Sequence, residues 1–280
     1  MKLVFTLAVA VLAWTASAQA QQRPLVTEDP ETIGAGLVLL EGGFDQQHEV
    51  FYPASGLQGN LLRFPTLGVS FGISSIAELQ VDGGLYNRLS ITSRQEAPLA
   101  NQLNFSGDTT HAVEDIVVAT KIRLLSETPS RPAFGVRLAT KLPNASNESG
   151  LGLDTTDFFV AALVGKTVQS IRFVGNVGLG ILADPTRGDR QNDVLTYGAS
   201  IARAVRQGLE VVGEINGRLD TREGEPPVGT ESRGAMRLGG RFTRSTVRAD
   251  AGLIFGITSS DPSIGFTVGV TWVFRGFTIP

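Results

Sequence analysis

The feature of this sequence that most constrains its fold is the order of its connections. Strand-like runs of about ten residues are separated by connections that are alternately short and long. The short ones read SS, SETPSRP, VQS, RQ and ST, whereas the long ones are rich in Gly, Pro, Asp, Asn and Ser, as loops are. This order is typical of an outer-membrane barrel, in which short turns are periplasmic and longer loops are extracellular.

We therefore predict an all-β fold, a transmembrane antiparallel up-and-down β-barrel with about twelve strands, since bacterial barrels have an even strand number. The predicted strands cover residues 33–44, 63–73, 76–87, 112–125, 133–143, 156–167, 171–183, 193–205, 208–219, 233–244, 247–258 and 263–274. The long connections are then 45–62, 88–111, 144–155, 184–192, 220–232 and 259–262. A β-sandwich with Greek-key connections would not sort its loops by length in this way.

Alternation within the runs agrees with a barrel that faces lipid outside and a polar lumen inside. In the last run, for example, Phe266 and Val268 alternate with Thr267 and Gly269. Small residues on the inward face suit a curved wall around a narrow lumen. The run at 156–167 is apolar on both faces, so we expect a loop or plug to cover part of its inward side.

The N-terminus predicts export. Lys2 precedes an apolar run of about a dozen residues and a small-residue cleavage site, which together indicate a signal peptide over residues 1–20. A membrane anchor helix is the alternative, but a span needs about 20 apolar residues. We expect residues 21–32 to be a periplasmic segment, residues 33–280 to form the barrel, both termini to be periplasmic, and the protein to reside in the bacterial outer membrane. The chain has no cysteine, so no disulfide stabilises it.

The expected inward-facing side chains carry many charges. The predicted lumen-lining residues are Glu78, Gln80, Asp82, Asp115, Lys121, Arg123, Arg137, Lys141, Arg172, Glu210, Glu214, Arg218, Arg237, Arg241, Arg248 and Asp250. The third and ninth runs are acidic and the fifth and tenth are basic. Two interpretations stay open: an electrostatically structured channel, or a network of salt bridges that fills a narrow interior.

The sequence offers little support for catalysis or for metal binding. His48 and His111 are its two histidines, and with Glu49, Glu114 or Asp115 they could bind a metal, but no metal-site motif is present. The net charge of −3, without a basic run, gives no sign of a nucleic-acid partner. We expect no catalytic, cofactor-binding or metal-binding residues.

A lipid hydrolase of the outer membrane is the enzymatic alternative. A nucleophilic serine needs a histidine within hydrogen-bond reach and a third group that orients it. Ser90 and His111 could form such a pair, although no motif supports it.

Two blocks of sequence resemble a known family. The first is RFPTLGVSFGISSIAELQVDGG, with an arginine-led strand, a Gly-Ile-Ser-Ser turn and the strand AELQV. The second is EDIVVATKIRLLSETPSRPAFGVRLATKLPNASNESGLGLDTTDFFVAALVGKT. In it, Asp115 and Lys121 mark a strand, Leu142-Pro143 ends another, and the Gly150–Gly152 loop follows. From about residue 30 to 274 the chain thus resembles the outer-membrane transporter-like proteins associated with the meta-cleavage pathway of phenol degradation.

This resemblance implies a single-chain, porin-like barrel that moves small hydrophobic or aromatic compounds, and it implies no catalytic set. The function we expect is passive passage or binding of such molecules. A barrel with a closed lumen that acts through its extracellular loops is the alternative, and the lipid hydrolase is a third. The expected partners are outer-membrane lipid, a small-molecule substrate and the barrel-assembly machinery during insertion.

Overall fold

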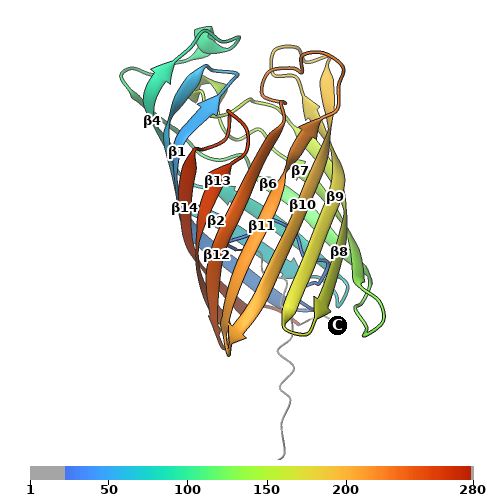
Figure 1. The fold of residues 1–280 in the computed structure, drawn as a ribbon. Coiled ribbons are helices and arrows are strands. Elements are labelled where there is room, and N and C mark those ends of the chain that lie inside the picture. The colour runs from blue at the N-terminus through green and yellow to red at the C-terminus, as the bar shows by residue number, and fades with distance from the viewer. Residues whose placement is uncertain (1–22, 279–280) are drawn as a thin grey trace, which may run out of the picture.

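Residues 23–278, which the computed structural model describes, form a closed antiparallel β-barrel (Figure 1). The twelve strands of its wall are β1 (Leu37–Tyr52), β2 (Leu57–Gly72), β3 (Ala77–Gly84), β6 (Val117–Leu125), β7 (Ala133–Lys141), β8 (Asp157–Val168), β9 (Ile171–Ala183), β10 (Gln191–Arg206), β11 (Leu209–Asp220), β12 (Arg233–Arg244), β13 (Val247–Gly256) and β14 (Ile264–Arg275). β1 pairs with both β2 and β14, which closes the barrel. The predicted fold class is confirmed, while the predicted signal peptide over residues 1–20 lies outside the described residues.

Most of the connections are sorted by length between the two ends of the barrel, and the exception is the short β1–β2 connection over residues 53–56 at the long-loop end. At one end, the short-turn rim, lie residues 73–76, 126–132, 169–170, 207–208 and 245–246. The longer connections lie at the opposite end, the long-loop rim, in the upper part of Figure 1. β1 begins and β14 ends at the short-turn rim, so the chain enters and leaves the wall on the same side.

The first two strands are longer than predicted. The expected loop over residues 45–62 is wrong. β1 continues to Tyr52, β2 begins at Leu57, and only residues 53–56 join them. Polar residues in this region resemble a loop in sequence, but here they are the inward side of a strand pair. Asp45 lies opposite Arg63 in the β1–β2 register and forms an ion pair with it at 3.1 Å.

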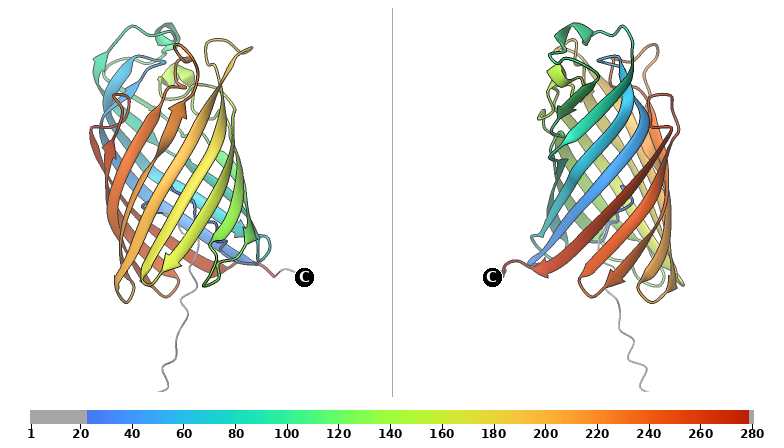
Figure 2. Two further views of the ribbon diagram at one scale, coloured as in Figure 1. Left: turned by 45° about the vertical axis from the view of Figure 1, so that its right-hand side comes forward. Right: turned by 90° about the vertical axis from the view of Figure 1, so that its left-hand side faces the viewer.

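The expected loop over residues 88–111 also contains strands. β4 (Asn87–Arg94) continues the direction of β3, and β5 (Thr109–Ala112) pairs with β4, with a 3-10 turn, η1 (Ala100–Gln102), between them. β2 pairs with β3 up to Thr66 and with β4 from Arg63. Pro65 lies between the two pairings. A proline has no N–H to donate to a ladder, so this position suits it. The β4–β5 hairpin stands at the long-loop rim (Figure 2).

That hairpin packs against the connection between β7 and β8, which holds a second 3-10 turn, η2 (Asn147–Ser149). Thr110 donates a hydrogen bond to the Ser149 carbonyl at 2.8 Å, and the Asn104 amide donates to the Glu148 carbonyl at 2.9 Å. The long-loop rim is therefore built from segments that hold one another in place.

The two faces of the wall differ in chemistry as the alternation predicts. Large exposed apolar residues cover the outside of β8 to β14, among them Phe158, Val177, Ile215, Leu238, Phe266 and Val270. The rings of Trp272 and Phe274 stack at 4.4 Å near the short-turn rim, where aromatic girdles occur. Inside, many buried side chains are polar or charged, such as Glu78, Lys121 and Asp250, and the largest apolar cluster, around Leu57 and Leu89, lies toward the long-loop rim. No helix within residues 23–278 is long and apolar enough to cross a membrane.

A charge on the outer wall should cost more at mid-height than at the rim. Val177, at the middle of β9, and Val168, at the end of β8, have similar exposed fractions of 55% and 51%. We expect Val177→Arg to lower the free energy of unfolding in lipid vesicles by about 2–4 kcal/mol and Val168→Arg by about 0–1 kcal/mol. Denaturant titrations of both variants measure this difference, and equal costs would contradict a lipid-facing position for Val177.

Candidate functional site

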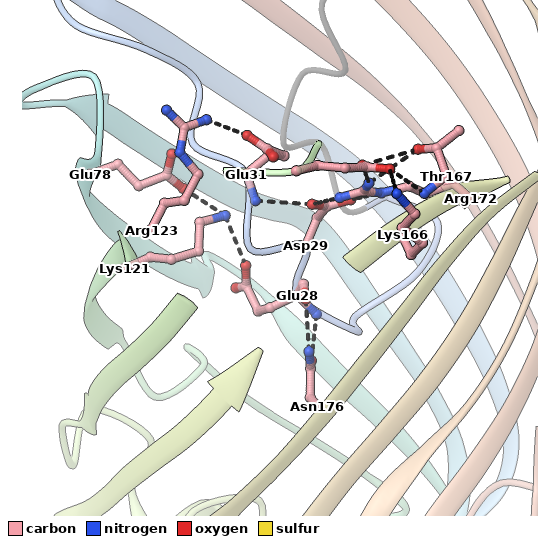
Figure 3. Close-up of polar contacts among 11 residues, drawn as sticks. Glu28, Asp29, Glu31, Glu78, Lys121, Arg123, Lys166, Thr167, Arg172 and Asn176 are labelled. Carbon is pink, nitrogen blue, oxygen red and sulfur yellow. Dashed lines mark hydrogen bonds and ion pairs between the residues drawn. The ribbon is translucent and has the colours of Figure 1, made fainter. Parts of the chain in front are cut away.

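The segment that precedes β1 lies inside the barrel and not outside it. Residues 23–33, which we call the N-terminal plug, contact inward-facing residues of the wall over their whole length, and Figure 3 shows the central contacts. We expected residues 21–32 to be a periplasmic segment, so the position of residues 23–32 differs from that expectation. The physical reason is charge: the plug carries Glu28, Asp29 and Glu31, and cations of the wall surround them.

The most deeply buried contact of the plug is made by Glu28. Its carboxylate lies 3.3 Å from Lys121 Nζ on β6 (Figure 3). It also lies 3.0 Å from Arg137 Nε on β7. Lys121 is fully buried and also pairs with Glu78 on β3 at 3.0 Å. Gln80 adds hydrogen bonds to Glu78 and Arg137. A buried charge is costly unless it is paired, so this cluster depends on the plug for one of its two carboxylates.

Further ion pairs hold the plug near the short-turn rim. Arg172 on β9 binds both oxygens of Asp29, at 2.9 and 2.6 Å, in the bidentate geometry that guanidinium and carboxylate favour. Arg123 on β6 pairs with Glu31. Glu127, in the turn after β6, pairs with Arg172 and accepts a hydrogen bond from the Thr167 amide at 2.7 Å. Burial acts to raise the pKa of Glu127, but these contacts outweigh it and hold the pKa below its usual range.

Side chains of the wall also satisfy the backbone of the plug. Glu214 on β11 accepts hydrogen bonds from the Val26 and Thr27 amides, at 2.9 and 2.8 Å. Glu78 accepts from the Ile33 amide at 2.8 Å. Asn176 on β9 accepts from the Glu28 amide and donates to its carbonyl, both at 2.7 Å. The plug is not in a helix or strand, so its backbone N–H and C=O groups have no secondary-structure partners. These side-chain hydrogen bonds satisfy several of them.

The first described residue, Arg23, binds the opposite, acidic side of the lumen. Its guanidinium donates to the Thr267 hydroxyl at 2.7 Å and lies 3.6 Å from Asp250 and 3.7 Å from Asp45. The plug is therefore charge-complementary to both sides of the lumen. Its arginine meets carboxylates of β1 and β13, and its carboxylates meet cations of β6, β7 and β9.

Glycines on the inner wall make room for the plug. A Cβ at Gly269 would lie 2.2 Å from Arg23 Nε, and one at Gly135 would lie 3.3 Å from Pro30 Cβ. The small inward residues of β14 thus do more than limit lumen volume, because they accommodate the guanidinium of Arg23.

Filling this space should loosen the plug. We expect Gly269→Val to displace the Arg23 guanidinium and to weaken plug docking by about 1.5–3 kcal/mol, the range for hydrogen bonds to a charged group. Faster hydrogen exchange of the Val26 and Thr27 amides measures this effect. Gly42→Val is the control, because nothing lies within 4 Å of a Cβ there. Equal exchange in the two variants would contradict the assigned role of Gly269.

Two cavities of about 420 Å³ each lie beside and beyond the plug. The inner chamber is lined by plug residues Arg23 to Val26 and Glu28, and by wall residues that include Asp45 and Arg237. The outer chamber lies toward the loops and is lined by Tyr52, Leu61, Leu151, Arg218 and Arg233, among others. Both chambers share the lining residues Arg63, Glu114, Asp115 and Val117, so they are adjacent. The two chambers thus lie next to each other between the loops and the plug.

The predicted lumen residues fall into three groups according to what they contact. Those at plug level are Glu78, Gln80, Lys121, Arg123, Arg137, Arg172, Glu214, Arg237 and Asp250. Those near the chambers and the long-loop rim are Asp82, Asp115, Lys141 and Arg218. Glu210, Arg241 and Arg248 lie together near the short-turn rim.

Neighbouring strands pair opposite charges, as the sequence suggested. Glu214 lies opposite Arg237 in the β11–β12 register and forms an ion pair with it at 3.0 Å. Glu210 and Arg241 repeat this arrangement four residues away, at 2.7 Å. On the other side, Lys141 pairs with Asp115 at 3.1 Å. These charges therefore join neighbouring parts of the wall, and several others bind the plug.

Sequence reasoning missed the residues that the plug supplies. Arg23, Glu28, Asp29 and Glu31 were not predicted to line the lumen, nor was Asn176. One signal was available, since three carboxylates within four positions precede a barrel whose predicted interior has more basic than acidic residues.

The histidine-based alternatives find little geometric support. Within residues 23–278, no three His, Cys, Asp or Glu side chains are close enough to hold a metal ion. Ser90 lies opposite Thr109 in the β4–β5 ladder, whereas His111 lies opposite Arg88 and its ring is 5.7 Å from that of Tyr86. No hydrogen bond joins Ser90 to His111 in the described chain.

Comparison with known proteins bears on the fold. No protein-family model matches the chain, and no curated protein matches its sequence. Among solved structures, it is similar to the COG4313 outer membrane channel from Pseudomonas putida F1, with 14% identity, a TM-score of 0.60 and coverage of 88% of this chain and 98% of that one. It is also similar to the NanC porin, with 10% identity, a TM-score of 0.52 and coverage of 84% and 98%. The chain has the fold of an outer-membrane β-barrel channel, and this fold implies the bacterial outer membrane.

Proposed function

We propose that this protein is an outer-membrane channel for passive passage or binding of small hydrophobic or aromatic molecules, and that the N-terminal plug closes it. The observation that carries the proposal is how the plug is held. Residues 23–33 form no backbone–backbone hydrogen bond with the described part of the wall. Side-chain hydrogen bonds and ion pairs hold them, so the plug can leave without breaking the barrel ladder.

The route that would open is already hollow on one side. The two chambers lead from the loops to the plug, and their linings mix apolar and charged groups. The similarity to a COG4313 channel supports a channel and says nothing about its substrate. The aromatic substrate class rests on the resemblance of residues 30–274 to the phenol meta-pathway family.

A closed binding barrel is the second candidate, and one observation favours it. Lys121 is fully buried between Glu28 and Glu78, and breaking such a pair is costly. If the plug never leaves, the protein would act through its extracellular loops. In either case we propose that it catalyses no reaction, and that its partners are outer-membrane lipid, a small molecule and the assembly machinery.

Current block in planar bilayers tests the substrate class. A barrel that lacks residues 23–33 should conduct ions, and catechol should block this current in a concentration-dependent manner, whereas glucose at the same concentration should not. The physical reason is the apolar part of the chamber linings, which favours an aromatic ring over a sugar. Conductance that both compounds leave unchanged would contradict the aromatic substrate, and absence of conductance would contradict the channel itself.

A further inference from the structure

Two arginines lie directly opposite each other at the edge of the outer chamber. Arg218 on β11 and Arg233 on β12 are Cα partners in the antiparallel ladder, and both line this chamber. Like charges at directly opposite ladder positions repel and destabilise the sheet. The other charged positions of this ladder avoid that conflict, since Glu214 lies opposite Arg237 and Glu210 opposite Arg241.

Neither arginine has a carboxylate at hydrogen-bond distance that would relieve this repulsion, although Asp261 lies within ion-pair range of Arg233. Arg218 forms no ion pair with any described residue, and its hydrogen bonds go to the carbonyls of Glu231 and Gly229, at 2.9 and 2.7 Å. Arg233 binds the carbonyls of Ser260 and Phe51, at 2.8 and 3.0 Å, and its nearest carboxylate oxygen, on Asp261, is 3.9 Å away. A guanidinium has five N–H donors, so each arginine retains donors beyond these two bonds.

Three other arginines of the lumen have a carboxylate at hydrogen-bond distance. Arg63 lies 3.1 Å from Asp45, Arg137 lies 3.0 Å from Glu28, and Arg237 lies 3.0 Å from Glu214. The Arg218–Arg233 pair therefore differs from them in having positive charge without a matching internal anion at hydrogen-bond distance.

Much of the rest of the outer chamber is apolar. Val50, Tyr52 and Leu61 from β1 and β2, with Leu151 and Leu153 from the β7–β8 connection, line it together with the two arginines. Val50, Leu61, Tyr52 and Leu151 belong to one apolar cluster. The chamber volume of about 420 Å³ lies within the range typical of small-molecule sites. Two carboxylates, Glu114 and Asp115, also line the chamber, but each is paired with a cation, Glu114 with Arg63 and Asp115 with Lys141. Two arginines without a carboxylate at hydrogen-bond distance, beside an apolar surface, suit a molecule with an anionic end and an apolar body.

We infer that the outer chamber binds a small amphipathic carboxylic acid, with its carboxylate between Arg218 and Arg233 and its apolar body against Val50, Tyr52 and Leu61. This inference rests on the proposed channel function and narrows its substrate class to organic acids. A purely structural role would instead have the two arginines brace the loops through the carbonyls that they bind.

Calorimetric titration of the folded, full-length mature barrel separates these two roles. Benzoate is the probe, and benzyl alcohol and benzylamine are its neutral and cationic counterparts. We expect benzoate to bind, and Arg218→Gln and Arg233→Gln each to weaken this binding by at least about tenfold through the loss of charge-assisted hydrogen bonds. Arg222→Gln, which removes an exposed arginine of the adjacent loop outside the chamber lining, should leave the affinity unchanged.

Arg233→Lys guards against loss of folding. A lysine keeps the positive charge but lacks the planar guanidinium that can bind both carboxylate oxygens. The Arg233→Lys variant should therefore bind benzoate with an affinity between those of the wild type and Arg233→Gln. Benzoate should also raise the unfolding temperature of the wild type more than that of Arg233→Gln. Benzoate affinity that is equal in wild type and both Gln variants, or equal binding of benzyl alcohol, would overturn the carboxylate site.

The outcome is separable from that of the proposed channel function. If the barrel without its plug conducts but benzoate does not bind, the carboxylate site is wrong and the channel stands. If benzoate binds as expected but removing the plug gives no conductance, the site stands within a closed binding barrel.

Discussion

Removal of residues 23–33 is expected to convert the barrel from rare, brief openings to continuous conductance in planar bilayers. The plug lies across the lumen and is held by Glu28, Asp29, Glu31 and Arg23. These contacts favour the closed state. Every additional 1.4 kcal/mol or so raises the ratio of closed to open molecules about tenfold. Several such contacts act together, so we expect the time-averaged conductance to rise by at least about tenfold.

A deletion elsewhere provides the control. Residues 223–225 are exposed in the β11–β12 connection and lie outside the chamber linings, so their removal should leave conductance as in the wild type. A barrel that folds without residues 23–33 and still conducts no more than this control would show that something other than the plug closes the lumen.

Lys121→Met is expected to have the largest effect of any single substitution. It would leave the carboxylates of Glu28 and Glu78 close together in a buried site without their shared cation. Removing one partner of a buried ion pair typically costs about 3–5 kcal/mol. Glu28 belongs to the plug and can move away, so much of this cost should shift the equilibrium toward the released plug. If the whole cost acts on this equilibrium, the open fraction should rise by more than about a hundredfold.

Two further variants test the cause of that effect. Lys166→Met removes a lysine that binds Glu127 and carbonyls of the turn after β6 and does not contact the plug, so it should not open the channel. Adding Glu78→Gln to Lys121→Met removes the repulsion between the two carboxylates and should restore part of the closure. If Lys121→Met conducts like the wild type while the barrel is folded, Lys121 does not hold the plug.

The wall of the barrel could be predicted from sequence because its determinants are local. From β7 to β14, turns and loops alternate in length, and side chains alternate in polarity, within windows of about ten residues. The predicted loop over residues 45–62 was wrong because polar residues there occupy the inward side of two long strands. Asp45 and Arg63 resemble loop residues individually, and only their pairing across β1 and β2 shows why they are in strands.

The plug could not be predicted because its contacts are distant in sequence. The Val26 amide and the Glu214 carboxylate that accepts its hydrogen bond are 188 positions apart. Inward-facing charges were identified from the alternation of each strand, but their partners were not, since strand alternation says nothing about a segment that is not in a strand. In this chain, the acidic segment ahead of the first strand supplies the carboxylates that pair with cations of the lumen wall.

Reversible locking of the plug tests the central claim most directly. The chain has no cysteine, and a Cβ at Gly198 on β10 would lie 3.4 Å from the Thr27 Cβ, close to the separation in a disulfide. Thr27→Cys with Gly198→Cys, in a barrel that also carries Lys121→Met, should therefore tie the plug to the wall when oxidised. We predict little conductance from the oxidised barrel and high conductance after a reducing agent is added to the same bilayer. Equal conductance before and after reduction, with the disulfide confirmed by mass spectrometry, would contradict closure by the N-terminal plug.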